Sequence, residues 1–196
     1  MFPAGAHFVI GWRGVAAKRD LPTLRGVRGE RIVVLHTAPA LDAASRPIFG
    51  ALAASIGLFA AGGLIGFAIS GPNVKIPAHY HGCIVGVTLA LMGLVFHVLP
   101  RLGYAAPQGR LAVAQPWLYG TGQLLHIIGL VWSGGYGVQR KVAGAEQVLR
   151  SGSEIAGMGL MGLGGLLAIV GGLLFVVVVM RAARPTPTPA LAQAAR

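Results

Sequence analysis

The sequence predicts an all-α integral membrane protein, a helical bundle with four transmembrane helices. Its composition is 55% apolar and only 11% charged, against roughly 45–50% and about 25% for soluble domains. After Arg46 the chain holds four stretches without Lys, Arg, Asp or Glu, at residues 47–74, 76–100, 111–139 and 155–180. A membrane helix needs about 20 mostly apolar residues, so each stretch is long enough to cross a bilayer.

The elements follow in chain order. Residues 1–46 mix Gly and Pro with basic side chains and predict a mostly irregular N-terminal segment. The membrane domain covers residues 47–180, with helices expected at residues 49–70, 78–99, 115–134 and 157–180. Residues 181–196 carry three prolines in an Ala-rich stretch and predict a disordered tail. Small residues repeat within the expected helices, which favours close helix packing in a bundle.

The basic residues fall mainly on one side of these helices. The net charge is +11, which on a folded surface could indicate nucleic-acid binding. Twelve of the 16 Lys and Arg lie in the N-terminal segment, around Arg101 and Arg110, or in the tail, and four lie on the other side. The positive-inside rule therefore places both termini in the cytoplasm, and the expected location is a bacterial or archaeal cell membrane. Most of the charge then marks topology, and nucleic acid is not an expected partner.

Two histidines at the start of the second helix are the main candidate site. Ionisable residues within membrane spans are costly and are functional candidates. His79 and His81 stand two residues apart, so on a helix they differ by about 200° and point to nearly opposite faces. One helix can thus offer an imidazole to each of two ligands on either side of it, and imidazole is a natural ligand for haem iron. The alternative is that both are interfacial histidines, solvated by headgroups and water.

Two more histidines lie in the expected spans. His97 falls near the cytoplasmic end of the second span, where an interfacial role is favoured over a role in a proton path. His126 is close to the middle of the third span, with Tyr119 and Gln123 on the same helix face. This polar stripe predicts a face turned to the bundle interior. His126 is favoured as a hydrogen-bonding residue, with a haem-ligand role as the alternative.

Three ordered segments resemble the haem-copper oxidase subunit I superfamily. IPAHYHGCIVGVTLALMGLVFHVLPRLGY is similar to the family's tenth helix, with its His-aromatic-His, its small residues and its closing Leu-Pro-x-Leu/Met-x-Gly. RPIFGALAASIGLFAAGGLIGF is similar to the ninth helix, and HIIGLVWSGGYGVQRKV to the segment that ends the eleventh. The resemblance runs over residues 46–184 and covers the last four helices of a twelve-helix core.

The resemblance implies specific roles. His79 would be the proximal ligand of a high-spin haem where oxygen binds, and His81 an axial ligand of a low-spin haem that delivers electrons. Arg140 and Lys141 fall where the family has an arginine pair that contacts the haem propionates. Lys at the second position keeps the charge and loses the bidentate geometry.

The departures from the family are equally specific. The family's copper ligands and its second low-spin haem ligand lie on helices with no counterpart here, the loop at residues 71–77 lacks a His-Asp pair, and Gln139 replaces a proline. We therefore expect a haem-binding membrane subunit, inactive alone in oxygen reduction. A partner chain would supply the remaining oxidase helices and the copper. The resemblance also places the subunit with other respiratory-complex subunits.

Two alternatives from other classes remain. One is a non-catalytic cytochrome b-type electron carrier, in which His81 and His126, within one chain or across an oligomer, hold one haem. The other is a degenerate structural remnant without haem. Visible spectra with and without carbon monoxide separate all three.

Overall fold

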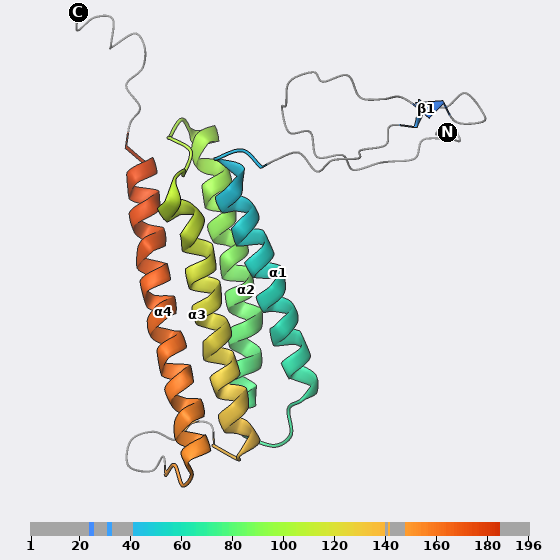
Figure 1. The fold of residues 1–196 in the computed structure, drawn as a ribbon, viewed down its shortest axis with the longest axis vertical. Helices are drawn as coiled ribbons and strands as arrows, with labels where there is room; N and C mark the ends of the chain where they lie inside the picture. Colours follow the sequence, from blue (N-terminus) through green and yellow to red (C-terminus); the bar gives the residue numbers. More distant parts are fainter. Residues whose placement is uncertain (1–23, 26–30, 33–40, 140, 142–147, 185–196) are drawn as a thin grey trace, which may run out of the picture. The chain divides into compact units, whose positions relative to one another are not determined.

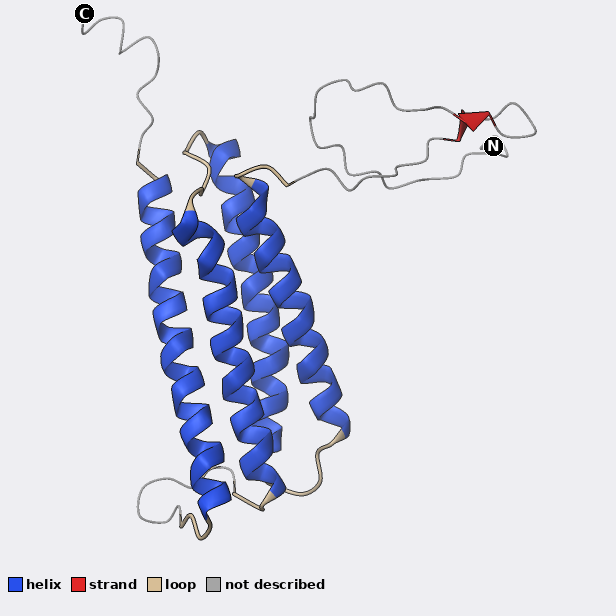
Figure 2. Cartoon of the chain, viewed as in Figure 1, coloured by secondary structure: helices blue, strands red, loops and turns tan. Residues whose placement is uncertain are grey.

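Four helices make up the part of the chain from Asp42 onward (Figure 1). The computed structural model describes residues 24–25, 31–32, 41–139, 141 and 148–184. The helices are α1 (Ser45–Phe67), α2 (Lys75–Val98), α3 (Arg110–Gly135) and α4 (Gly152–Ala182), and α2 continues into the short 3-10 helix η1 (Leu99–Leu102). Figure 2 shows the four long helices running side by side, α1 beginning and α4 ending at the same end of the bundle.

Three of these helices are long and apolar enough to cross a membrane. They are Ser45–Phe67, Lys75–Leu102 with its 3-10 extension, and Gly152–Ala182. This indicates a membrane location. Helix α3 has the length, at 26 residues, but it carries more polar side chains than the others.

The N-terminal residues that the structure describes form a separate small element. Strands β1 (Leu24–Arg25) and β2 (Arg31–Ile32) pair antiparallel. The rest of the predicted irregular segment, residues 1–23, 26–30 and 33–40, lies outside the described residues, as do residues 185–196 of the predicted tail.

The four helices begin three to five residues earlier than the sequence predicted, and at α1 and α4 side-chain hydrogen bonds cap the added turn. At α1, the Asp42 carboxylate accepts a hydrogen bond from the Ser45 backbone N–H at 2.7 Å. At α4, the Ser151 hydroxyl accepts from the Glu154 N–H at 3.2 Å, and the Glu154 carboxylate accepts from the Arg150 N–H at 2.6 Å. Ser and Glu three residues apart are the signature of a capping box.

Glycines set the distance between helices within two pairs, α1 with α2 and α3 with α4. A Cβ on Gly62 of α1 would lie 2.5 Å from the Cys83 nitrogen and 2.7 Å from the Gly82 carbonyl carbon of α2. Helix α4 makes similar backbone contacts with α3 at positions seven residues apart, Gly157, Gly164 and Gly171. Close backbone approach through small residues is how membrane helices associate without a hydrophobic driving force.

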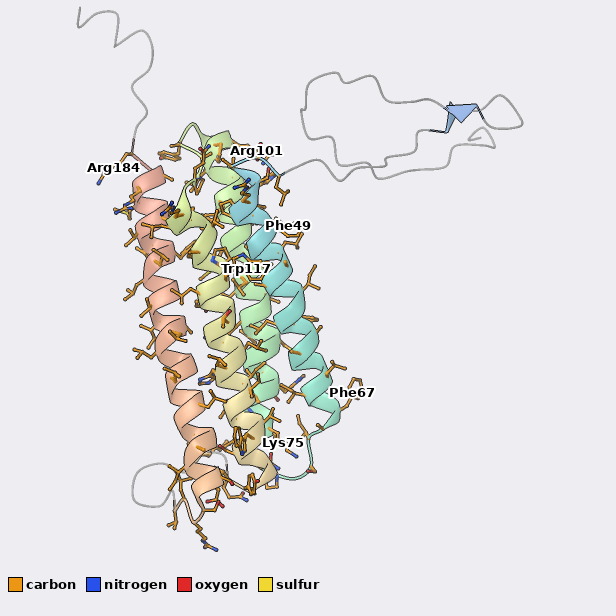
Figure 3. All side chains as sticks on the ribbon, in the orientation of Figure 1. Phe49, Phe67, Lys75, Arg101, Trp117 and Arg184 are labelled. Carbon is orange, nitrogen blue, oxygen red and sulfur yellow. The ribbon has the colours of Figure 1, made fainter. Side chains whose placement is uncertain are left out.

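Large apolar side chains cover the outside of the bundle. On α1, Phe49 is 52% exposed and Phe67 is 91% exposed, and both extend outward from the helix in Figure 3. The buried core is small by comparison and centres on residues such as Leu58, Leu89 and Ile127. An apolar exterior around an interior of small residues matches a protein whose solvent is lipid.

Candidate functional site

His79 lies in the first two turns of α2 and faces α1. Its Nδ1 is 2.8 Å from the Gly62 carbonyl oxygen, and the ring is half-buried. Gly66, one turn along α1, leaves room for the ring, because a Cβ there would lie 3.1 Å from the imidazole Nδ1 and Cε1. The Cys83 sulfur lies 3.8 Å from Nδ1 on the other side. The His79 imidazole is therefore seated in a groove of α1 made by two glycines.

His81 lies on the opposite side of the same helix and faces α3. Its Nδ1 is 2.8 Å from the Pro77 carbonyl oxygen one turn back, and its side chain is exposed. Its ring packs against that of His126, with the ring centres 4.9 Å apart and the planes tilted by 43°. The prediction that His79 and His81 point to nearly opposite faces of their helix is confirmed.

His126 completes a layer of three imidazoles. It belongs to α3, is half-buried, and its Nδ1 is 3.0 Å from the Met161 carbonyl oxygen of α4. Its ring thus connects α2, α3 and α4 at one level of the bundle. The sequence predicted this interior-facing stripe, and its electron-carrier alternative also paired His126 with His81, although around a haem rather than in direct ring contact.

All three rings share one hydrogen-bonding pattern. A backbone carbonyl oxygen can only accept, so Nδ1 must carry the proton in each case. Nε2 is then the basic nitrogen with a free lone pair. Among the described residues none hydrogen-bonds to Nε2 of His79, His81 or His126. Histidines that ligate metals usually donate their other ring N–H to a carbonyl or carboxylate in this way, which fixes both tautomer and orientation.

The polar stripe on α3 faces the bundle interior, as predicted. Tyr119 packs against Gly171 of α4, and the Gln123 Oε1 is buried without a hydrogen-bond partner. The stripe also extends further than predicted. Gln115 is fully buried and donates to the Gly171 carbonyl at 3.2 Å, and Ser133 is fully buried at the other end. Gln115 and Ser133 continue the helical spacing of Tyr119 and His126, so this spacing could have predicted them from the sequence.

Of the two residues expected to contact propionates, Lys141 is described and Arg140 lies outside the described residues. Lys141 is exposed and has a positive φ of 63°. It lies at the end of the bundle where α2 begins, because Val74 donates to the Val138 carbonyl at 3.1 Å and Asn73 pairs with Gln139. That is also the end nearer to His79 and His81.

The imidazoles of His79 and His81 are donors that could hold a haem iron. In the part of the chain that the structure describes, no three His, Cys, Asp or Glu side chains gather into a metal-binding group. Haem needs only one or two axial ligands from the protein, and imidazole is the commonest. His79 and His81 each offer a free Nε2 on a ring whose orientation is fixed from the backbone, which is what an axial ligand requires.

Comparison with known proteins identifies related bacterial sequences. No known family profile matches the chain. The chain is 43% identical over 136 residues, 64% of its length, to an uncharacterised protein of Rickettsia prowazekii (strain Madrid E). It is 36% identical over 59 residues, 30% of its length, to an uncharacterised protein of Aquifex aeolicus (strain VF5). The matched residues make up 26% and 15% of those proteins, so the chain spans about a quarter or less of the curated relatives it matches.

Proposed function

We propose that the chain is a haem-binding membrane subunit similar to the C-terminal part of cytochrome c oxidase subunit I. It would contribute haem ligands for electron transfer and oxygen reduction in an aerobic respiratory chain. The observation that supports this most is the pair of imidazoles on α2, which face opposite sides of one helix, each with Nδ1 bound to a carbonyl and Nε2 free. Two haems on either side of one helix require this arrangement.

Each histidine has a definite part in the proposal. The Gly62 carbonyl holds His79 against α1, so its Nε2 would ligate the high-spin haem where oxygen binds. The Pro77 carbonyl holds His81 within its own helix, so its Nε2 would ligate the low-spin haem. When bound, the haem irons supply the one-electron chemistry. The chain supplies ligation, a fixed ring orientation, and a spacing set by two residues of helix.

Arg140 and Lys141 are proposed to pair with haem propionates. Charge-assisted hydrogen bonds between cations and carboxylates are the strong ones, and they would anchor the haem edge at this end of the bundle. Lys141 is exposed there and forms no ion pair with any described carboxylate. The loop that carries both residues follows α3 directly.

A partner chain is part of the proposal. The segments that resemble the family do not include the histidines that would bind copper there. The exposed apolar faces of α1 and α4 have room for further helices as well as lipid.

We propose that α3 also crosses the membrane, because α1 and α2 pack against it on one side and α4 on the other.

The alternative carrier with His81 and His126 on one haem is less well supported within a single chain. For His81 and His126 to hold one haem, the flat macrocycle would have to lie between their two rings. The ring centres are 4.9 Å apart, and the two rings touch. A macrocycle between them would require α2 and α3 to separate at this level.

The test is a spectrum of the reduced chain with and without carbon monoxide. We expect a Soret band that shifts with carbon monoxide in the unmodified protein and a loss of that shift in His79→Ala. His97→Ala, on the same helix near its other end, is the matched control and should keep the shift. A Soret band that is indifferent to carbon monoxide would favour the electron carrier, and the absence of any Soret band would overturn both functions.

A further inference from the structure

A pocket opens between the start of α1 and the end of α2, at the end of the bundle away from His79 and His81. It has a volume of about 380 Å³, within the range of small-molecule sites. Ile48 and Phe96 form apolar walls, and Ser45, His97 and Arg101 form the polar side. The pocket thus joins an apolar surface to a cationic rim at the level where the helices end.

Arg101 is the charged group of this pocket, and it is free to bind an anion. One of its terminal nitrogens donates to the His97 carbonyl at 3.1 Å, which holds the side chain over the pocket. It forms no ion pair with any described carboxylate. Asp42, the one described acid at this end, is exposed and its carboxylate accepts from the Ser45 N–H at 2.7 Å.

The whole end of the bundle is cationic in the described ranges. Five arginines stand at the helix ends here against the single acid Asp42, and they are Arg46, Arg101, Arg110, Arg181 and Arg184. A second, smaller pocket of about 220 Å³ repeats the pairing of an arginine, Arg181, with apolar walls from Leu111 and Val178. Each pocket joins one arginine to apolar side chains at the same end.

We propose that the Arg101 pocket binds the phosphate of an anionic phospholipid. A guanidinium offers several N–H donors in a fork that matches phosphate geometry. The pocket lies at the end of two helices that are apolar enough to span a membrane, where headgroups meet the hydrocarbon. The phosphate would bind Arg101 with His97 and Ser45 at its edge, and an acyl chain would lie along Ile48 and Phe96. Basic pockets between membrane helices bind anionic lipids in this manner.

The experiment titrates the full chain in detergent with phosphatidylglycerol or phosphatidylcholine and counts bound lipid by native mass spectrometry. We expect preferential retention of phosphatidylglycerol. Arg101→Gln should weaken the binding of phosphatidylglycerol about fivefold, because it removes one arginine near the membrane surface. Arg101→Lys should recover part of it. Arg184→Gln is the matched control, because Arg184 lies at the same end (Figure 3) but lines neither of the two pockets.

Three outcomes would overturn the proposal. Equal weakening in Arg101→Gln and Arg184→Gln would show diffuse surface attraction without a site. Equal retention of both lipids would show that the headgroup charge is not recognised. Displacement of phosphatidylglycerol by millimolar inorganic phosphate would show that the pocket takes the free anion. Circular dichroism of each variant separates these outcomes from misfolding, and none of them depends on haem.

Discussion

At the scale of single residues, the backbone controls the chemistry of the site. The carbonyls of Gly62, Pro77 and Met161 each accept from a histidine Nδ1, so three rings are held in the same tautomer. The sequence predicted the opposite directions of His79 and His81, because two residues on a helix differ by about 200°. It could not predict that the Gly62 and Met161 carbonyls are the partners of His79 and His126, since those partners depend on which helices become neighbours.

A substitution at Gly66 tests whether the position of the His79 ring against α1 affects haem binding. A side chain in Gly66→Val would push on the imidazole, because a Cβ already lies 3.1 Å from it. Loss of outer-shell support for a metal ligand typically weakens binding by about 10–100-fold, and we expect this range for haem retention at His79. Gly63→Val is the control, since a Cβ there meets nothing within 4 Å. Titration of both variants with haem measures the effect, and equal affinities would contradict the role of the groove.

Asp42 makes the stability of the start of α1 depend on pH. The Ser45 side chain and then its backbone N–H donate to the carboxylate, which lowers the pKa of Asp42 below its ordinary value of 3.8. A carboxylate whose pKa is lower in the folded protein stabilises the fold at pH values above its ordinary pKa. This contribution to stability is lost as the pH falls through the pKa of the folded state.

We therefore expect Asp42→Ala to melt at a lower temperature than the unmodified chain at neutral pH. The gap should close as the pH falls below 3.8, because the protonated carboxyl no longer favours the helix N-terminus. Thermal melting in detergent at several pH values measures the gap. A gap independent of pH would show that Asp42 acts through packing alone.

At the scale of elements, the sequence predicted four helices at the right places and misjudged their ends. Uncharged stretches mark where a helix can lie in lipid, but caps decide where it begins. The caps at Asp42 and Ser151 include charged residues just outside those stretches. The Ser151–Glu154 spacing was a readable signal. The pairing of α1 with α2 and of α3 with α4 follows from glycines whose partners no local pattern specifies.

Gly62 tests the close packing of α1 on α2. In Gly62→Leu the new side chain would meet the backbone of Gly82 and Cys83, which cannot rotate away. Overpacking of this kind costs typically about 1–3 kcal/mol, so we expect a clear loss of stability in Gly62→Leu. Gly63→Leu, one residue along, points into open space and should leave stability unchanged. Denaturant titration followed by circular dichroism compares the two, and equal stabilities would contradict the described α1–α2 contact.

At the scale of the whole molecule, α3 is the central helix and the least apolar of the four. Its buried Gln115 and half-buried His126 both donate to carbonyls of α4, while Gln115 Oε1, Gln123 Oε1 and the Ser133 hydroxyl are buried without a hydrogen-bond partner among the described residues. A polar helix can cross a bilayer when its neighbours supply its hydrogen bonds. Composition alone cannot show this, because it does not say what a side chain contacts.

Cysteine labelling tests whether α3 crosses the membrane. In a Cys83→Ser background, Gln108→Cys stands before α3 and Val148→Cys after it, and both positions are exposed. If α3 spans the membrane, an impermeant maleimide labels them from opposite sides. Ser70→Cys, between α1 and α2, should share the side of Val148→Cys. Labelling of Gln108→Cys and Val148→Cys from the same side would contradict four spans.

The central claim, that His79 and His81 each hold a haem, is tested most directly by gentle detergent purification of the tagged chain with haem and copper quantified. We expect up to two haems per chain, a further membrane subunit that copurifies, and copper only when that subunit is present. His79→Ala and His81→Ala should each remove one haem, while His97→Ala removes none. Recovery of a folded chain that is alone and colourless would contradict the account.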